Sequence, residues 1–274
     1  MKENNEKLAV VVAGGNGAGK STFINHQLLP LYKTTGINYI NADDWQKKHF
    51  GRFDNTTPEQ AIMAQKWAEN SRKEHLDQGK SFITETVFSH PSKIELLKDA
   101  KEHGFTVDLY HISLDSTDKA LDRISERVLL GGHDVDAEKV KQRYERVAPI
   151  VKDALKYTDR AYIYDNSVMN RPHQLILELE KGQIKSIHAD LPNWVKTAYK
   201  EHLDIYYSKL QEQLSDSQKQ AFKLFQDEIR KVFKDHPGLT EEKLNELNTR
   251  LPDIVSGKIK LPEISQEKEK DRGR

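Results

Sequence analysis

A glycine-rich segment directly after a short apolar run constrains this chain more than any other feature. Residues 14–21 read Gly-Gly-Asn-Gly-Ala-Gly-Lys-Ser and match the pattern G-x-x-x-x-G-K-S/T. The apolar residues 9–13 predict a buried strand before it, and the apolar-periodic residues 20–29 predict a helix after it. This order is typical of a phosphate-binding loop, and a glycine-rich turn without a ligand is the alternative.

The residue types of this loop fit phosphate chemistry. Glycines let the backbone turn its N–H groups inward around phosphate oxygens. Lys20 is expected to reach the terminal phosphates as a point charge. The hydroxyl of Ser21, at the helix N-terminus, is expected to bind Mg²⁺. The segment therefore predicts a nucleoside triphosphate as the ligand.

The first 195 residues alternate short apolar runs with longer, charged, helix-period stretches. This alternation predicts an α/β fold with a mostly parallel sheet flanked by helices. Together with the phosphate loop, it indicates the P-loop NTPase, nucleotide-kinase-like fold class. The predicted strands are residues 9–13, 37–40, 81–84, 106–114 and 161–164, followed by an edge hairpin of 175–179 and 184–187. The predicted helices are residues 20–29, 58–78, 91–103, 118–130 and 137–157.

The pattern of apolar and charged residues changes after about residue 195. Apolar residues now recur every three or four positions in a highly charged background, which predicts an α-helical C-terminal extension. Ser215 is expected to start one helix, and Thr240 another after a break at residues 237–238. We therefore expect a kinase-like domain at 1–195, a helical extension at 196–264 and a disordered charged tail at 265–274.

Composition excludes several classes of protein. The chain has no cysteine, which rules out a disulfide scaffold, a cysteine zinc site and a thiol nucleophile. Lys+Arg 43 balances Asp+Glu 43, and this net charge of +0 argues against nucleic acid or an anionic membrane as the main partner. No apolar run approaches the length of a membrane span or a signal sequence, so we expect a soluble, cytoplasmic protein.

Acidic residues follow three of the predicted strands. Asp43 and Asp44 follow the second strand, Glu85 the third and Asp115 the fourth. Open α/β sheets bind ligands at the carboxyl ends of their strands, where a carboxylate can accept a hydroxyl proton or hold Mg²⁺ through water. A helix N-cap is the alternative for Asp43 and Asp44, and a turn or cap for Asp115. Glu85 follows a buried strand and needs a partner.

Arginines are concentrated in two neighbouring helices. Arg123 and Arg127 share one face of the first helix, and Arg143 and Arg146 lie in the second. Gly131 and Gly132 lie between them and suggest a hinge and a lid over a phosphoryl group, while a structural role is expected for His133. Solvated surface charge is the alternative for each arginine.

A polar turn follows the last predicted parallel strand. Residues 162–167 read Tyr-Ile-Tyr-Asp-Asn-Ser, so Asn166 would lie where an adenine ring could bind. A plain turn is the alternative.

In their order along the chain, these segments resemble the zeta toxin-like kinases. The resemblance covers about residues 7–195. It rests on residues 13–22, 41–43, 85–89, 131–135 with 143–144, and 164–167. It implies a kinase that uses ATP and Mg²⁺ to phosphorylate a sugar hydroxyl. In the best-known case this is the 3′-hydroxyl of the N-acetylglucosamine unit of UDP-N-acetylglucosamine. The resemblance also implies a toxin with an antitoxin protein as its partner.

The same resemblance assigns roles to residues of this chain. Asp43 would be the general base, while Glu85 and Thr86 would face the acceptor. Arg127 and Arg143 would clamp the phosphates and take part in catalysis with Lys20. The residues expected to bind the nucleotide are Gly15, Asn16, Gly17, Ala18, Gly19, Lys20, Ser21, Thr22 and Asn166, with Ser21 as metal ligand.

Two other functions are compatible with the motifs. One is a housekeeping nucleoside or metabolite kinase, which would share the chemistry without the toxicity. The other is a nucleotide-dependent interaction module in which the C-terminal helices bind a partner. The extension after Trp194 could serve as an inhibitor, a docking arm or a delivery segment.

Overall fold

The computed structural model describes residues 6–33, 35–51, 57–132 and 134–261. The described residues form two compact units, one that ends at Lys200 and one that begins at Glu201. His133 and the tail predicted at 265–274 lie outside the described residues. The separate domain expected from residue 196 stays a prediction.

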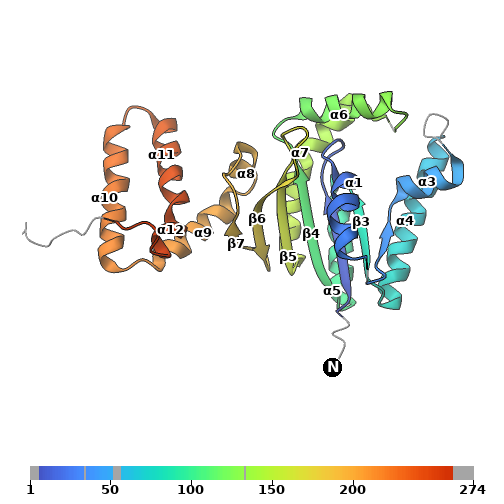
Figure 1. Ribbon diagram of the computed structural model, residues 1–274, viewed down its shortest axis with the longest axis horizontal. Coiled ribbons are helices and arrows are strands. Elements are labelled where there is room, and N and C mark those ends of the chain that lie inside the picture. Colours follow the sequence, from blue (N-terminus) through green and yellow to red (C-terminus); the bar gives the residue numbers. More distant parts are fainter. Residues whose placement is uncertain (1–5, 34, 52–56, 133, 262–274) are drawn as a thin grey trace, which may run out of the picture. The chain divides into compact units, whose positions relative to one another are not determined.

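A seven-stranded sheet organises the first unit (Figure 1). Its order is β2-β3-β1-β4-β5-β6-β7, parallel from β2 to β5 and antiparallel in the last two strands. The strands are β1 Leu8–Ala13, β2 Asn38–Ile40, β3 Phe82–Thr86, β4 Thr106–Ser113, β5 Arg160–Asp165, β6 Gln174–Glu180 and β7 Gln183–Ile187. The predicted fold class and the edge hairpin are confirmed.

Strand β1 is central, and its composition follows from that position. Residues 9–13 are all apolar and buried, as expected for a strand covered on both faces. Its side chains pack with those of β3, β4 and the helix after the phosphate loop. The loop therefore begins directly after a run of five buried residues.

Helices flank the sheet (Figure 1). They are α1 Lys20–Phe23, α2 Leu29–Leu31, α3 Ala42–Phe50, α4 Pro58–Gln78, α5 Ser92–Glu102, α6 Thr117–Leu129, α7 Ala137–Ala154 and α8 Asn193–Ala198. A capping box of Thr57 and Gln60 starts α4, whose predicted bounds are confirmed. In Figure 1, α3 and α6 lie at the end of the sheet opposite the N-terminus.

The helix predicted at residues 20–29 is interrupted. A π-helical turn, Ile24–Leu28, joins α1 to α2. Pro30 follows this turn, and in a regular α-helix its ring would crowd the carbonyl of residue 26. The wider π turn relieves this contact.

The second unit is helical. Its helices are α9 Lys200–Glu212, α10 Asp216–Val232, α11 Pro237–Thr249 and α12 Leu251–Val255. A capping box of Ser215 and Gln218 starts α10, which confirms the start predicted at Ser215. The start predicted at Thr240 is wrong: α11 begins at Pro237, because proline is tolerated at the first helical position. Among the described residues, no helix combines the length and apolarity of a membrane span.

Candidate functional site

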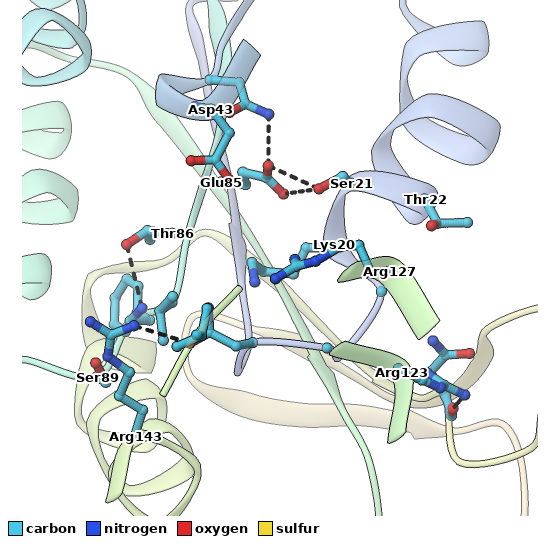
Figure 2. A pocket seen from close by; sticks show the side chains of 18 of the residues that line it. Lys20, Ser21, Thr22, Asp43, Glu85, Thr86, Ser89, Arg123, Arg127 and Arg143 are labelled. Atoms are coloured by element: carbon cyan, nitrogen blue, oxygen red, sulfur yellow. Dashed lines mark hydrogen bonds between the residues drawn. The ribbon is translucent and has the colours of Figure 1, made fainter. Parts of the chain in front are cut away.

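A cavity of about 1050 Å³ lies at the carboxyl edge of the sheet in the first unit. It is lined by the phosphate loop, the start of α3, the end of β3, and parts of α4, α6 and α7. Figure 2 shows this region from close by. The nucleotide-loop residues Asn16, Gly17, Gly19, Lys20, Ser21 and Thr22 line it, as do Asp43, Glu85, Thr86, Arg127, Arg143 and Asn166.

Two side chains from the segment between β5 and β6 hold the phosphate loop. Gly19 has a left-handed backbone with φ 94°, and a Cβ there would collide with the side-chain amide nitrogen of Asn166. That nitrogen donates to the carbonyl of Ala18 at 2.9 Å. The Nε2 atom of His173 lies 3.2 Å from the carbonyl of Gly19, a contact that requires the proton on Nε2. Two donors thus fix two successive carbonyls of the loop.

This geometry gives Asn166 a specific position. The predicted polar turn is buried under the phosphate loop, and Asn166 contacts the loop itself. Its part in binding an adenine ring stays a prediction. His173 was missed by the sequence analysis because a lone histidine after a polar turn matches no motif.

Lys20 is surrounded by charges of both signs. Its ammonium donates to the carbonyl of Gly15 at 3.0 Å. Burial lowers the pKa of Lys20, and the carboxylates of Glu85 and Asp43 oppose this shift. The positive charges of Arg127 and Arg143 lower the same pKa further. Three cations that repel one another in one cavity favour an anionic ligand.

Glu85 contacts the residue expected to bind the metal. The Ser21 hydroxyl lies 3.0 Å from both carboxylate oxygens of Glu85, as Figure 2 shows. Strand β3 continues through Glu85 and Thr86, so both residues belong to the strand rather than follow it. Because β3 pairs with β1, with Glu85 level with Val12, its end lies beside the phosphate loop. Burial raises the pKa of Glu85, while Lys20 and Ser21 lower it.

The donor set here fits Mg²⁺. The described residues contain no cluster of three or more His, Cys, Asp or Glu that could enclose a metal. Mg²⁺ in kinase sites needs no such cage, because it keeps several waters and binds substrate phosphates. One hydroxyl and one carboxylate, from Ser21 and Glu85, are oxygen ligands of the kind it prefers.

Asp43 lies in the first turn of α3. The N-cap of this helix is Asn41, whose side chain accepts hydrogen bonds from the backbone of Asp43 and Asp44. The cap alternative for the two aspartates is therefore wrong, because a residue before them already fills that position. The carboxylate of Asp43 is left exposed to the cavity.

The structure separates the four arginines. Arg127 and Arg143 line the cavity, and Arg143 donates to the side chain of Asn16 at 3.2 Å. Arg123 also lines it, but donates to the carbonyl of Asn166 at 2.7 Å and so braces the turn under the loop. Arg146 donates to its own helix, at the carbonyl of residue 142. Arg127 and Arg143 are thus the best placed for a phosphoryl group.

The glycines after α6 set the position of Arg127. The N–H of Gly132 donates to the carbonyl of Arg127 at 2.9 Å. A Cβ on Gly132 would lie 2.5 Å from Cγ of Arg127, so glycine permits this close packing. A lid hinged at Gly131 and Gly132 stays a prediction, and His133 lies outside the described residues.

The remaining candidates have separate environments. Asp115 forms an ion pair with Lys119 at 2.7 Å, and its backbone N–H donates to the Ser167 hydroxyl. The Thr86 hydroxyl accepts the N–H of Phe88 at the cavity wall. Arg72 of α4 also lines the cavity, and burial lowers its pKa. Arg72 was missed because a single arginine within a helix gives no sequence signal.

Comparisons with known proteins place this geometry in a family. A family model described as zeta toxin matches residues 1–173. A protein of Haemophilus influenzae, described as uncharacterized, is 39% identical over 153 residues, which cover 51% of this chain and 94% of that protein.

Two similar solved structures come from the AvrRxo1-ORF1:AvrRxo1-ORF2 complex. The one with sulphate ions has a TM-score of 0.53 at 15% identity, over 74% of this chain and 71% of that chain. The one with ATP has a TM-score of 0.51 at 15% identity, over 94% of this chain and 82% of that chain. At this identity the similarity is one of fold.

Proposed function

This chain belongs to the zeta toxin family, and we propose that it transfers the γ-phosphoryl group of ATP to a hydroxyl of a small molecule. Family and fold support a phosphotransferase of the P-loop type. The observation that carries the proposal is that a single cavity joins the phosphate loop, the carboxylate of Asp43 and the cations Arg127 and Arg143. The similar structure solved with ATP supports ATP as the nucleotide.

The residues divide the reaction between them. Lys20 exchanges the carbonyl of Gly15 for the terminal phosphates. Asp43 takes the proton of the acceptor hydroxyl. At the same time the oxygen of this hydroxyl forms a bond to the γ-phosphorus, and the bond between the γ-phosphorus and the ADP oxygen breaks. Arg127 and Arg143 stabilise the charge on the transferred group. Ser21, with Glu85 beside it, would hold Mg²⁺, which would supply positive charge to the phosphates.

The acceptor in this proposal is an amino-sugar nucleotide such as UDP-N-acetylglucosamine. The resemblance of residues 41–43 and 85–89 to the family supports it. The cavity of about 1050 Å³ is at the upper end of ligand-binding sites, which supports a large acceptor beside ATP. Because the chain belongs to the zeta toxin family, we also propose that the free chain is toxic and that an antitoxin protein inhibits it.

Mass spectrometry tests the reaction directly. The full chain is incubated with ATP, Mg²⁺ and a panel of nucleotide sugars, with Lys20→Ala as the blank. We expect a product heavier by one phosphate that is missing with Lys20→Ala and with Asp43→Asn, while Asp43→Asn still binds ATP. A fully active Asp43→Asn variant would exclude Asp43 as the base.

Expression in a bacterium tests the biological part. We expect the wild type to arrest growth and Asp43→Asn to be harmless at the same protein level. A harmless wild type that still forms the product would favour a housekeeping kinase. Toxicity that persists in an Asp43, Glu85 double variant would favour an interaction module.

A further inference from the structure

The side chain of Asn41, the N-cap of α3, also contacts groups outside its helix. Asn41 lies between β2 and α3 and is only 7% exposed. Its Oδ1 atom accepts the N–H of Asp43 at 2.8 Å and that of Asp44 at 3.3 Å. Its Nδ2 atom donates to Glu85 Oε1 at 2.7 Å and to the Tyr39 hydroxyl at 2.7 Å.

These four contacts use the full hydrogen-bonding capacity of the amide. A side-chain amide has two N–H donors and two acceptor lone pairs. Turning the amide of Asn41 over would point its N–H groups at two backbone N–H groups, and its oxygen at a carboxylate. The contacts therefore fix both the position and the orientation of the side chain.

From this geometry we propose that Asn41 is a positioning residue, which holds the helix that carries Asp43 at a set distance from Glu85 and Ser21. The hydrogen-bonded path runs from the first turn of α3 through Asn41 to Glu85, and from Glu85 to the Ser21 hydroxyl at 3.0 Å. The two ends of one amide thereby join the side of the cavity with the base to the side with the phosphates. The kinetic part of this inference rests on the proposed function.

The residue type follows from the two tasks. Serine and aspartate cap helices about as well as asparagine does. Aspartate at position 41 would place a second carboxylate against the buried Glu85, and alanine would remove both functions. A serine hydroxyl has a single donor, whereas asparagine offers an acceptor to the helix and two N–H donors, one for Glu85 and one for Tyr39.

The first experiment requires no catalytic activity. Melting temperatures are measured for the full chain, Asn41→Asp, Glu85→Gln and the double variant Asn41→Asp/Glu85→Gln. Asn41→Asp keeps the cap but opposes two carboxylates, so we expect its melting temperature to fall by on the order of 5 °C. In the double variant the amide introduced at position 85 can donate to the carboxylate introduced at position 41, so most of that loss should be recovered. Strictly additive shifts would overturn the link between Asn41 and Glu85.

The second experiment separates positioning from folding. Asn41→Asp and Asn41→Ala should lower kcat by on the order of a hundredfold, as expected when reacting groups are misplaced by about 1 Å, while the KM for ATP changes less than about threefold. Thr57→Ala is the matched control, because Thr57 is the N-cap of α4 and does not line the cavity. We expect its kcat to stay within about threefold of the wild type.

Two outcomes contradict the positioning role. The first is an Asn41→Ala variant with kcat within about threefold of the wild type, and the second is an equal loss in Thr57→Ala. A wild type that transfers phosphate to no acceptor would contradict the proposed function instead. In that case the melting temperatures still decide whether Asn41 and Glu85 are coupled.

Discussion

The phosphate loop and the arginine-bearing helices α6 and α7 line the same cavity but are held in different ways. Two successive carbonyls of the loop accept hydrogen bonds from Asn166 and His173, and the loop leaves the fully buried strand β1. On the other side, Arg143 is linked to the loop by one bond of 3.2 Å. Leu129 and Leu130, at the end of α6, are each 87% exposed.

This difference suggests a division of labour. A loop that is held in its binding conformation before the ligand arrives loses little conformational entropy when it binds phosphate. In the proposed reaction, the long side chains of Arg127 and Arg143 can follow the phosphoryl group as its charge changes during transfer. We therefore expect changes in the loop supports to affect ATP affinity, and changes in the arginines to affect the rate of transfer.

The largest effect is expected from the arginines. Arg127→Lys and Arg143→Lys keep the charge but lose the planar fork that binds phosphate at two points. Each should lower kcat by on the order of a hundredfold, with a smaller change in the KM for ATP. Steady-state kinetics measure both values. Arg146→Lys is the control, because Arg146 donates to its own helix; an equal loss there would show that the cavity position does not matter.

A smaller effect is expected from the support of the loop. Asn166→Ala removes the donor to the buried carbonyl of Ala18, which costs about 1–3 kcal/mol. ATP binding should weaken by roughly tenfold or more, while kcat at saturating ATP changes less. Calorimetric titration with ATP and Mg²⁺ checks this, with Asn248→Ala in the second unit as control. Unchanged affinity in Asn166→Ala would refute the idea of a loop held in advance.

The smallest effect concerns the strand behind the loop. His111 of β4 lies level with Ala13, the residue before the phosphate loop, and is 0% exposed. Burial lowers its pKa from 6.5 to about 3. As the pH falls, His111 therefore binds a proton near pH 6.5 in the unfolded chain but only near pH 3 in the folded chain.

The sign of the pH effect follows from this difference. The stability contributed by neutral His111 is complete above pH 6.5 and is lost as the pH falls toward 3, by about 1.4 kcal/mol for each unit. Urea unfolding at pH 7, 6, 5 and 4 measures the slope. His111→Gln should flatten the slope by that amount, and an unchanged slope would show that His111 does not cause it.

The boundary between the two units shows the limit of composition as a guide. The pattern of apolar and charged residues changes near residue 195, yet Tyr199 is fully buried in the first unit. Its hydroxyl is hydrogen-bonded to Nδ1 of His111 at 2.7 Å. The indole N–H of Trp194 donates to Asp165 at 2.7 Å, directly before Asn166. These contacts join residues far apart in the chain, so no local pattern could predict them.

Local signals were sufficient for many of the strands and helices and for the phosphate loop, but not for the π turn after α1 or the start of α11. Periodicity, helix caps and turn residues act over a few positions of the chain. They were enough to predict the glycines and Lys20 of the loop, the bounds of α4 and the edge hairpin. The strand order was decided by tertiary packing. By placing β3 against β1, it brought Glu85 to Ser21, and by placing β2 against β3, it brought Asn41 to Glu85. The sequence determined which side chains could do the chemistry. The tertiary structure decided which of them meet, because the hydrogen bonds that join them cross between strands distant in the chain.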